Sequence, residues 1–557
     1  MLYGSVKQVK ADAQELMSQA SVIKDSAKGG DGAALSAAVD TIAAKTDSIN
    51  SEVHKPLWNL AALIPVYGED VRSVQKLGEI GETLVDDALT PISRNVSGLS
   101  LNNLVKDGAI DVNLLSTFSS AVLDSLPAIQ TSVTQISSLP DPHIGKLKDI
   151  FDKIKKPLSS AEGLIDQARP ILENLPSMLG ANGQTRRYLI IAQNNSELRA
   201  TGGLPGSWGT ITVSDGVISM GEFQTILHAD GLSVEMTDEE RQAIATNMNT
   251  DPAQVNCTPD FKRVGEMAQD YWEQATGEKV DGVFAIDPVF LQRLLSLTGG
   301  ITTADGTVVD GTNAAKVLLS DTYWKFGNDY TAQDEFFSGV AGQCFEQVMG
   351  HLGEAGLEPL MDVLTKSAKD GRILVWMQNE DEEGVIRLFG LTGELGADPS
   401  KPVLGVYFND DTYSKMSWYL KAKTTVDSGT KNPDGTTTYN CQTEVTNTIT
   451  DDIASQAYMY IYGGNSLKRG RDDMIYFMFL YGPAGGSISN VEVSGDGLVA
   501  GSNVVDSSLS GLEVERLHAN TRAQQTMTVT YQVTVSAAAT QPLEVRTTPL
   551  AQEELMQ

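Results

Sequence analysis

The chain has 557 residues, of which 41% are hydrophobic and 20% are charged, and its formal net charge at pH 7 is −31. A chain of this length is too long for a single hydrophobic core, so two to four domains are expected, and the composition is that of a folded protein. The acidic balance excludes nonspecific nucleic-acid binding, which depends on cationic side chains that release counterions, and it disfavours broad contact with anionic lipids.

Residues 1–183 are predicted to be helical, because apolar residues recur along them at spacings of three and four. The longest such row runs from Ile144 to Leu179. These repeats average 3.5 residues and keep one apolar seam facing a partner helix. Breaks at Lys28–Gly30, Leu139–Pro142 and Gly180–Gly183 separate the helices. A helical bundle or elongated hairpin, acting as a stalk, is therefore expected; its seams form a core or a surface for a partner protein.

Residues 184–400 are predicted to form an α/β domain. Tyr188–Ala192 is an apolar run of strand length, and Val280–Ile286 is a second strand that a helix from Pro288 follows. From residue 401 the helical patterns stop, and strand-like runs alternate with turn residues, as in a β-sandwich over residues 401–557. These runs are residues 403–408, 417–425, 437–450, 457–462, 474–480 and 522–535. The fold class is thus multidomain α+β: a helical bundle, an α/β domain and a β-sandwich.

The segment from Asn194 to Gly209 is the first candidate site. It places Asn194, Asn195, Glu197 and Arg199 directly after a strand, where ligands of α/β sheets tend to bind, and its glycines allow tight turns or close approach to a ligand. Arg199 could hold a phosphate in a bidentate fork; alternatively, it makes an internal salt bridge in a structural turn. The glycine spacing matches no dinucleotide or P-loop pattern, which excludes a nucleotide site.

A second candidate site lies between residues 321 and 333. Asp321, Tyr323, Asp329 and Gln333 could bind a sugar hydroxyl or Mg²⁺, which prefers oxygen ligands; alternatively, the segment is a solvated loop with helix caps. The five histidines are scattered, which argues against a zinc hydrolase or a serine hydrolase.

The three cysteines, Cys257, Cys344 and Cys441, form no disulfide framework and no metal motif. They could be three reduced core thiols, or one bridge and a free thiol. A bridge between Cys257 and Cys344 would close a loop of about 90 residues and contribute roughly 4–5 kcal/mol in the chain-entropy model.

Several motifs resemble the domain-of-unknown-function 4012 family of bacterial envelope proteins. They are Ile64–Gly68, Tyr188–Gly203 (YLIIAQNNSELRATGG), Pro259–Phe261, Val280–Pro288 and Phe408–Met416. The resemblance extends over nearly the whole chain. Members of the family usually begin with a cytoplasmic tail and one membrane helix. The resemblance therefore implies an extracytoplasmic protein that is anchored in the cell membrane by a helix upstream of Met1, although no segment here has the ~18 apolar residues that span a bilayer.

The α/β part also looks like the LytR-CpsA-Psr ligases, which transfer a glycopolymer from a polyprenyl-pyrophosphate carrier to peptidoglycan. The similar segments are Val280–Asp287, Leu294–Ile301, Asp310–Leu318, Asp329 and Gln333. In that family arginines hold the pyrophosphate and an aspartate-bound Mg²⁺ assists. Taken with the two candidate sites, the likeness implies catalytic roles for Arg199 and Asp329. The candidate sites themselves supply the expected metal ligand, Asp321, and the expected substrate contacts, Asn194, Asn195, Glu197, Tyr323 and Gln333. The sequence departs from the family at Ala332, where a family arginine is replaced, and a second arginine is missing too.

Two hypotheses follow. In the first, a membrane-tethered envelope protein handles cell-wall or capsular glycopolymer. Whether it is an enzyme stays open; the activity considered is phosphotransfer from the lipid carrier, assisted by Mg²⁺. In the second, the chain is a non-catalytic scaffold that binds glycan or another envelope protein. The retained polar loop favours the first hypothesis, and the missing arginines favour the second. Neither hypothesis includes a nucleic-acid partner.

Overall fold

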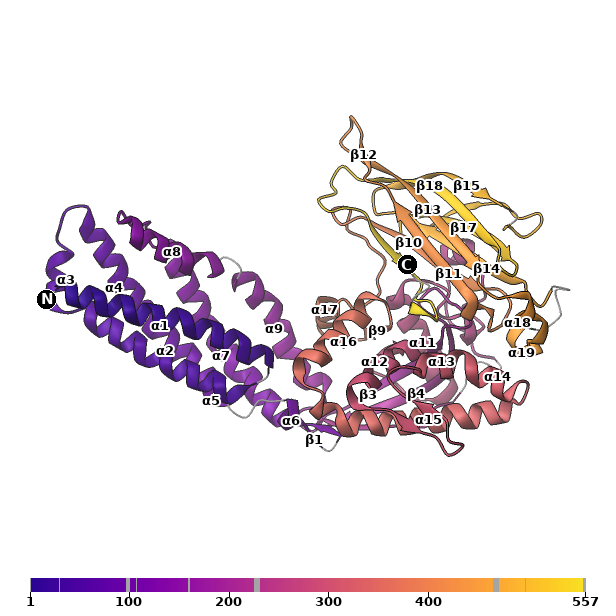
Figure 1. The fold of residues 1–557 in the computed structure, drawn as a ribbon, viewed down its shortest axis with the longest axis horizontal. Helices are drawn as coiled ribbons and strands as arrows, with labels where there is room; N and C mark the ends of the chain where they lie inside the picture. Colours follow the sequence, from indigo (N-terminus) through magenta and orange to yellow (C-terminus); the bar gives the residue numbers. More distant parts are fainter. Residues whose placement is uncertain are drawn as a thin grey trace. The chain divides into compact units, whose positions relative to one another are not determined.

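The computed structural model describes residues 2–29, 31–96, 101–106, 108–158, 161–224, 231–463, 470–495 and 497–553 (Figure 1). The fold is mixed, with many helices and several sheets, as the sequence predicts. It divides into two compact units. The helical unit comprises Met1–Arg186, Val213–Ile218 and Met349–Met361, and the mixed unit comprises Arg187–Thr212, Ser219–Val348 and Asp362–Gln557.

The helical unit is built mainly from long helices, with short helices between some of them. In chain order the helices are α1 (Leu2–Gly29), α2 (Gly32–Val53), α3 (Pro56–Ala61), α4 (Tyr67–Leu84), α5 (Thr90–Val96), α6 (Leu101–Leu104), α7 (Val112–Ser138), α8 (Gly145–Leu158) and α9 (Ala161–Met178). A π-helical turn, Val85–Leu89, joins α4 to α5. Asp31 and Asp111 cap α2 and α7 by accepting backbone N–H groups. The helices are interrupted at each of the three predicted breaks. Two short strands, β1 (Val105–Lys106) and β2 (Ala109–Ile110), follow α6.

Among the described residues one helix, α7, is long and apolar enough by composition to cross a membrane. Its residues Leu115, Leu126, Val133 and Ile136 are buried, and it packs against α4, α5 and α9 of the same unit. The core helix of a bundle has the same properties, so the composition of α7 alone identifies no membrane span.

The first layer of the mixed unit is a sheet in which β4 (Leu204–Ser214), β3 (Thr185–Asn194), β6 (Gly282–Ile286) and β9 (Ile373–Met377) lie in this order. β3 and β6 are parallel, and β9 is antiparallel to β6. β4 continues through a tight turn into β5 (Val217–Met220). The accompanying helices are α10 (Asp238–Ile244), α11 (Phe261–Thr276), α12 (Pro288–Thr298), α13 (Ala314–Lys316), α14 (Thr322–Phe326), α15 (Tyr330–His351), α16 (Leu357–Lys369) and α17 (Glu380–Leu388), with a small hairpin of β7 (Ile301–Thr302) and β8 (Val308–Val309).

The C-terminal part of the mixed unit contains two five-stranded sheets. One has the order β16 (Val505–Leu509), β17 (Leu512–Thr521), β14 (Met474–Tyr481), β10 (Val403–Asp410), β19 (Glu544–Thr547). The other has the order β11 (Leu420–Val426), β13 (Thr437–Asn447), β18 (Thr526–Val535), β15 (Ser487–Ser494), with β12 (Thr430–Lys431) paired to β13. Phe408 and Leu480 of the first sheet share one apolar core with Val445 and Val529 of the second. The helix α19 (Met459–Tyr462) takes the place of the strand predicted at residues 457–462, and α18 (Asp451–Gln456) precedes it.

One apolar core connects the α/β layer with the C-terminal sheets. Leu189 of β3 and Val283 of β6 belong to the same buried cluster as Phe479 of β14 and Val514 of β17. Residues on both sides of position 401 therefore lie in one compact unit. The division into 1–183, 184–400 and 401–557 stays a prediction.

Candidate functional site

The carboxyl ends of the parallel strands β3 and β6 meet where the first candidate site was expected. β3 ends at Asn194, and the loop Asn195–Gly203 follows it; β6 ends at Ile286, and Asp287 then caps α12 by accepting the Phe290 N–H. Proline at the first position of α12 suits a helix start, because its missing N–H would have no partner there. In open α/β sheets this edge is the usual position of a ligand.

Protein groups occupy this position. Arg372 donates to Asp287 Oδ2 at 2.8 Å, and both side chains are buried. Asn195 donates to the same carboxylate oxygen at 3.1 Å and to the Pro549 carbonyl at 2.9 Å. Asn195, predicted to contact substrate, therefore connects the strand edge to the C-terminal segment of the same unit.

Arg199, the predicted pyrophosphate-binding arginine, has no exposed surface. Its guanidinium lies 3.5 Å from Glu197 Oε1 and donates to the backbone carbonyls of Ala253 and Leu198. Burial alone would lower the pKa of Arg199, but neighbouring acidic groups that include Glu197 raise it above its usual value. In this structure the planar donors of Arg199 contact protein groups and face no open surface, and the catalytic role stays a prediction. The alternative interpretation, an internal salt bridge, describes these contacts correctly.

Glu197 and Asn194 also have internal partners. Glu197 Oε2 accepts from Lys415 Nζ at 2.5 Å, and the Lys415 ammonium lies 5.4 Å from the ring centre of Tyr323. Asn194 Nδ2 donates to the Tyr323 hydroxyl. The structure thus brings three predicted substrate-binding residues together, but Glu197 and Tyr323 are buried and contact protein groups. Burial raises the pKa of the Tyr323 hydroxyl, so it stays neutral.

Asp410 completes this set of buried charges, which we call the buried charge cluster: Glu197, Arg199, Asp410 and Lys415. Burial raises the pKa of the Asp410 carboxyl, with the nearby Glu197 adding to the effect. Its Oδ1 accepts from the backbone N–H of Thr412 at 2.6 Å. The cluster joins the loop after β3 to the segment after β10, so it holds the sheet layers together.

The second candidate site does not assemble. Asp321 pairs with Lys316: both carboxylate oxygens of Asp321 lie 2.8 Å from Lys316 Nζ. Asp329, also predicted to be catalytic, is exposed and accepts the Ala332 N–H near the start of α15. Gln333 is buried and donates to the Gly327 carbonyl at 2.7 Å. These residues do not fit a Mg²⁺ site, and no group of three or more His, Cys, Asp or Glu side chains in the described part of the chain could hold a metal ion.

The glycines of the first loop serve close backbone approach. A Cβ on Gly203 would lie 2.0 Å from the Asn194 carbonyl oxygen, and Gly202 has a φ of +147°. The close approach that these glycines allow is thus an approach between two segments of the chain.

The predicted bridge between Cys257 and Cys344 is absent. These two residues and Cys441, all in the described part of the chain, are free and buried. Cys257 lies in the core beside Leu189 and Val283 and donates to Gln254 Oε1. Of the alternatives left open, the three reduced core thiols describe the structure.

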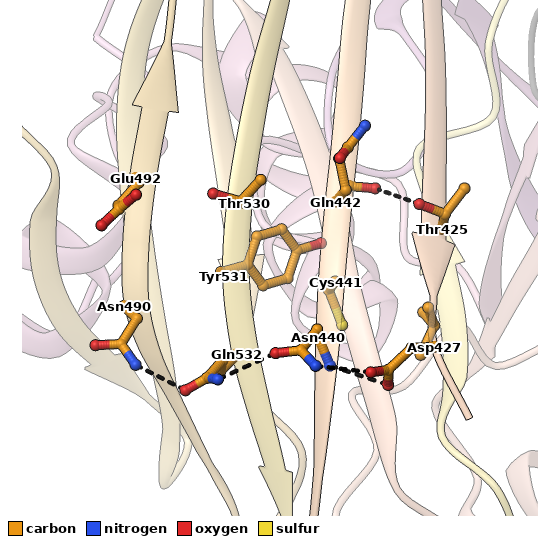
Figure 2. A pocket seen from close by; sticks show the side chains of 11 residues that line it. Thr425, Asp427, Asn440, Cys441, Gln442, Asn490, Glu492, Thr530, Tyr531 and Gln532 are labelled. Atoms are coloured by element: carbon orange, nitrogen blue, oxygen red, sulfur yellow. Dashed lines mark hydrogen bonds between the residues drawn. The ribbon is translucent and has the colours of Figure 1, made fainter. Parts of the chain in front are cut away.

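A different surface carries an open groove lined by polar side chains. We call it the amide groove; it lies on the face of the sheet β11-β13-β18-β15 and has a volume of about 650 Å³. Figure 2 shows a row of side chains across it: one each from β15, β18 and β13, and one from the turn after β11. Asn490 donates to Gln532 at 2.7 Å, Gln532 to Asn440 at 3.0 Å, and Asn440 to Asp427 at 2.7 Å.

Sequence reasoning missed the amide groove. The available signal was alternation: Asn440 and Gln442 face outward around buried Cys441, and Thr530 and Gln532 do so around buried Tyr531. The register Asn440↔Gln532 that aligns the amides follows from strand pairing, which local patterns do not reveal.

The family model described as "Protein of unknown function (DUF4012)" matches residues 183–323. This segment includes β3, the loop after it and β6, so the resemblance to that family is confirmed over residues 183–323. Comparisons with curated proteins and with solved structures gave no match. The likeness to LytR-CpsA-Psr ligases stays a prediction.

Proposed function

We propose that this chain is a non-catalytic scaffold of the bacterial cell envelope that binds a cell-wall or capsular glycopolymer through the amide groove. The observation that carries the proposal is the hydrogen-bonded row Asp427–Asn440–Gln532–Asn490. Each amide in it uses part of its hydrogen-bonding capacity along the row. A primary amide has two N–H donors and two acceptor lone pairs, so further donors and acceptors remain for a ligand.

A glycan suits this surface better than a phosphate. Hydroxyl groups both donate and accept hydrogen bonds, and they match amides and carboxylates that lie in a row. The described residues that line the amide groove include Asp427 and Glu492 but no lysine or arginine. An anionic pyrophosphate would meet two carboxylates and no compensating cation.

The phosphotransferase alternative lacks a supporting observation. It needs an arginine that reaches a pyrophosphate, and Arg199 has no exposed surface. It also needs carboxylates that share a metal, whereas Asp321 pairs with Lys316 and Asp329 caps a helix. A scaffold needs only a folded chain and a binding surface, and the amide groove is a candidate for that surface.

The proposed location is outside the cell, with the chain tethered by a membrane helix upstream of Met1. The family resemblance supports this location. Protease treatment of intact cells tests it: the chain should be cut together with a known surface protein, while a cytoplasmic marker stays whole. Protection of the chain under these conditions would contradict the topology.

Glycan binding is tested by sedimentation of the purified chain with insoluble peptidoglycan and with purified capsular polysaccharide. The Asn440→Ala/Gln532→Ala variant should lose at least about tenfold in affinity, because each lost hydrogen bond contributes roughly 0.5–1.5 kcal/mol. The matched control is Thr446→Ala/Thr526→Ala, which removes an exposed cross-strand hydrogen bond outside the groove. Equal binding by all three proteins, or no binding, would reject the amide groove. Tight binding of a polyprenyl pyrophosphate that Arg199→Lys abolishes in a folded protein would favour the enzyme.

A further inference from the structure

One end of the helical unit presents an apolar tip, the segment Pro56–Gly68 (PLWNLAALIPVYG), which contains no charged residue although 20% of the chain is charged. Six of its large apolar side chains are exposed to solvent: Leu57, Leu60, Leu63, Ile64, Val66 and Tyr67. Leu60 and Leu63 are 69% and 79% exposed, the highest values among the exposed large hydrophobic residues of the described chain. An exposed apolar patch of this kind marks an interaction surface.

The backbone of the apolar tip is held in a strained shape. Val66 has φ +70° and ψ −63°, and the Tyr67 N–H donates to the Pro65 carbonyl at 2.9 Å, which closes a γ-turn that is rare for a β-branched residue. Val66 also stands at the N-cap of α4, where a polar side chain is usual. Strain of this kind persists where the surrounding structure enforces it, and it concentrates at functional segments.

Two contacts enforce this shape. Arg72 donates to the Ala62 carbonyl at 2.6 Å, and a Cβ on Gly68 would lie 2.3 Å from the same oxygen, so only glycine fits there. Gln75 donates to Asn59 at 2.8 Å. The exposed apolar side chains therefore stand on a fixed frame, which reduces the entropy lost when they bind.

The chemistry of the apolar tip fits a lipid bilayer. Leu60 and Leu63 are the most exposed large apolar side chains of the tip. A protein partner would need a matching cavity for them, whereas the interfacial layer of a bilayer accepts exposed apolar groups without shape complementarity. Tyr67 can remain at the headgroup level, where aromatic side chains are favoured. Lys55 lies beside the tip, pairs with Glu52 and keeps its charge exposed to water. Because the tip itself is uncharged, its binding needs no anionic lipid.

The start of α1 lies beside the apolar tip. Trp58 of α3 donates to Ser5 of α1 at 2.7 Å, and Figure 1 shows the N-terminus next to α3. We propose that the apolar tip inserts into the interfacial layer of a lipid bilayer and holds the helical unit against the membrane surface. This inference rests on the proposed envelope function, which places the chain next to a membrane. A chain segment upstream of α1 would leave the helical unit at the end that carries the apolar tip.

Vesicle sedimentation of the 557-residue chain tests the insertion without any membrane helix. Vesicles of phosphatidylcholine alone should bind the chain, and 0.5 M NaCl should leave binding unchanged because no charge pairing is involved. Leu60→Ser/Leu63→Ser/Ile64→Ser should lower the partition coefficient at least about tenfold. The control, Leu388→Ser/Phe389→Ser, removes exposed apolar groups of the mixed unit and should bind like the wild type. Circular dichroism verifies that all variants are folded.

Three results would overturn the proposal: no binding of the wild type to phosphatidylcholine vesicles, equal binding by the triple variant, or binding restricted to phosphatidylglycerol vesicles and abolished by salt. Dimerisation of the wild type that the triple variant loses, without vesicle binding, would assign the apolar tip to a second copy of the chain. The glycan assay uses residues of the mixed unit and no lipid. If the chain binds glycan but not vesicles, only the membrane role of the apolar tip is rejected. If it binds vesicles but not glycan, only the glycan role of the amide groove is rejected.

Discussion

Lys415 Nζ lies 2.5 Å from Glu197 Oε2 although the two residues are 218 positions apart in the chain. Their side chains are 5% and 3% exposed. Burial alone would lower the pKa of Lys415, but the adjacent Glu197 carboxylate raises it, so the Lys415 ammonium stays protonated. A buried ion pair contributes little net free energy, but loss of one partner leaves an uncompensated charge.

Lys415→Met should therefore lower the free energy of unfolding of the mixed unit by about 3–5 kcal/mol, measured by urea denaturation. Glu197→Gln should be costly for the same reason, and the double variant should cost less than the sum of the two single changes. Lys421→Met, at an exposed position of β11, is the matched control and should change stability by less than about 0.5 kcal/mol. Additive effects of the two single changes would mean that the pair is not coupled.

Local features were predictable from the sequence because they depend on neighbouring residues. The three breaks in the helical region, the Asp287–Pro288 start of α12 and the mixed fold class are examples. The side chains that contact the carboxyl ends of β3 and β6 were not predictable from the sequence. Lys415 and Arg372 reach Glu197 and Asp287 from distant positions, and local patterns do not specify such contacts. The polar loop consequently resembled a ligand site, although its charges are neutralised within the fold.

Gly203→Ala should destabilise the mixed unit by about 1–3 kcal/mol or more, because the added Cβ would lie 2.0 Å from the Asn194 carbonyl oxygen. Gly206→Ala is the matched control in the same segment, since its Cβ would meet nothing closer than 3.9 Å. Thermal unfolding of both variants measures the difference. Equal melting temperatures would show that the loop can shift without cost.

The three cysteines should react slowly with iodoacetamide in the native protein. Burial raises the pKa of Cys257 and Cys344 to about 11 and that of Cys441 to about 12, so the reactive thiolate is scarce at pH 8. In urea without reductant, mass spectrometry should find three alkylated thiols. Detection of only one would restore the predicted bridge.

Asp260, in the Pro259–Phe261 motif and at the N-cap of α11, should make the stability of the mixed unit depend on pH. Burial raises the pKa of its carboxyl to about 6, against about 3.9 in an unfolded chain. A raised carboxyl pKa means that the folded state binds the proton more tightly. Its stabilising contribution is therefore complete below about pH 4 and is lost as the pH rises through about 6.

Asp260→Asn isolates this contribution, because asparagine has nearly the same size and shape as aspartate and does not ionise. The stability of the variant minus that of the wild type should rise by roughly 1–3 kcal/mol between pH 4 and pH 7.5, with most of the change between about pH 4 and pH 6. Both proteins contain the other carboxyl groups, many of which have lowered pKa values and weaken the fold as the pH falls. The contributions of these groups therefore cancel in the difference between the two stabilities. Urea denaturation at half-unit pH steps measures it. A difference that does not change with pH would show that the Asp260 carboxyl is hydrated in the folded protein, and a difference that falls would mean that the ionised form is stabilised by the N-terminus of α11.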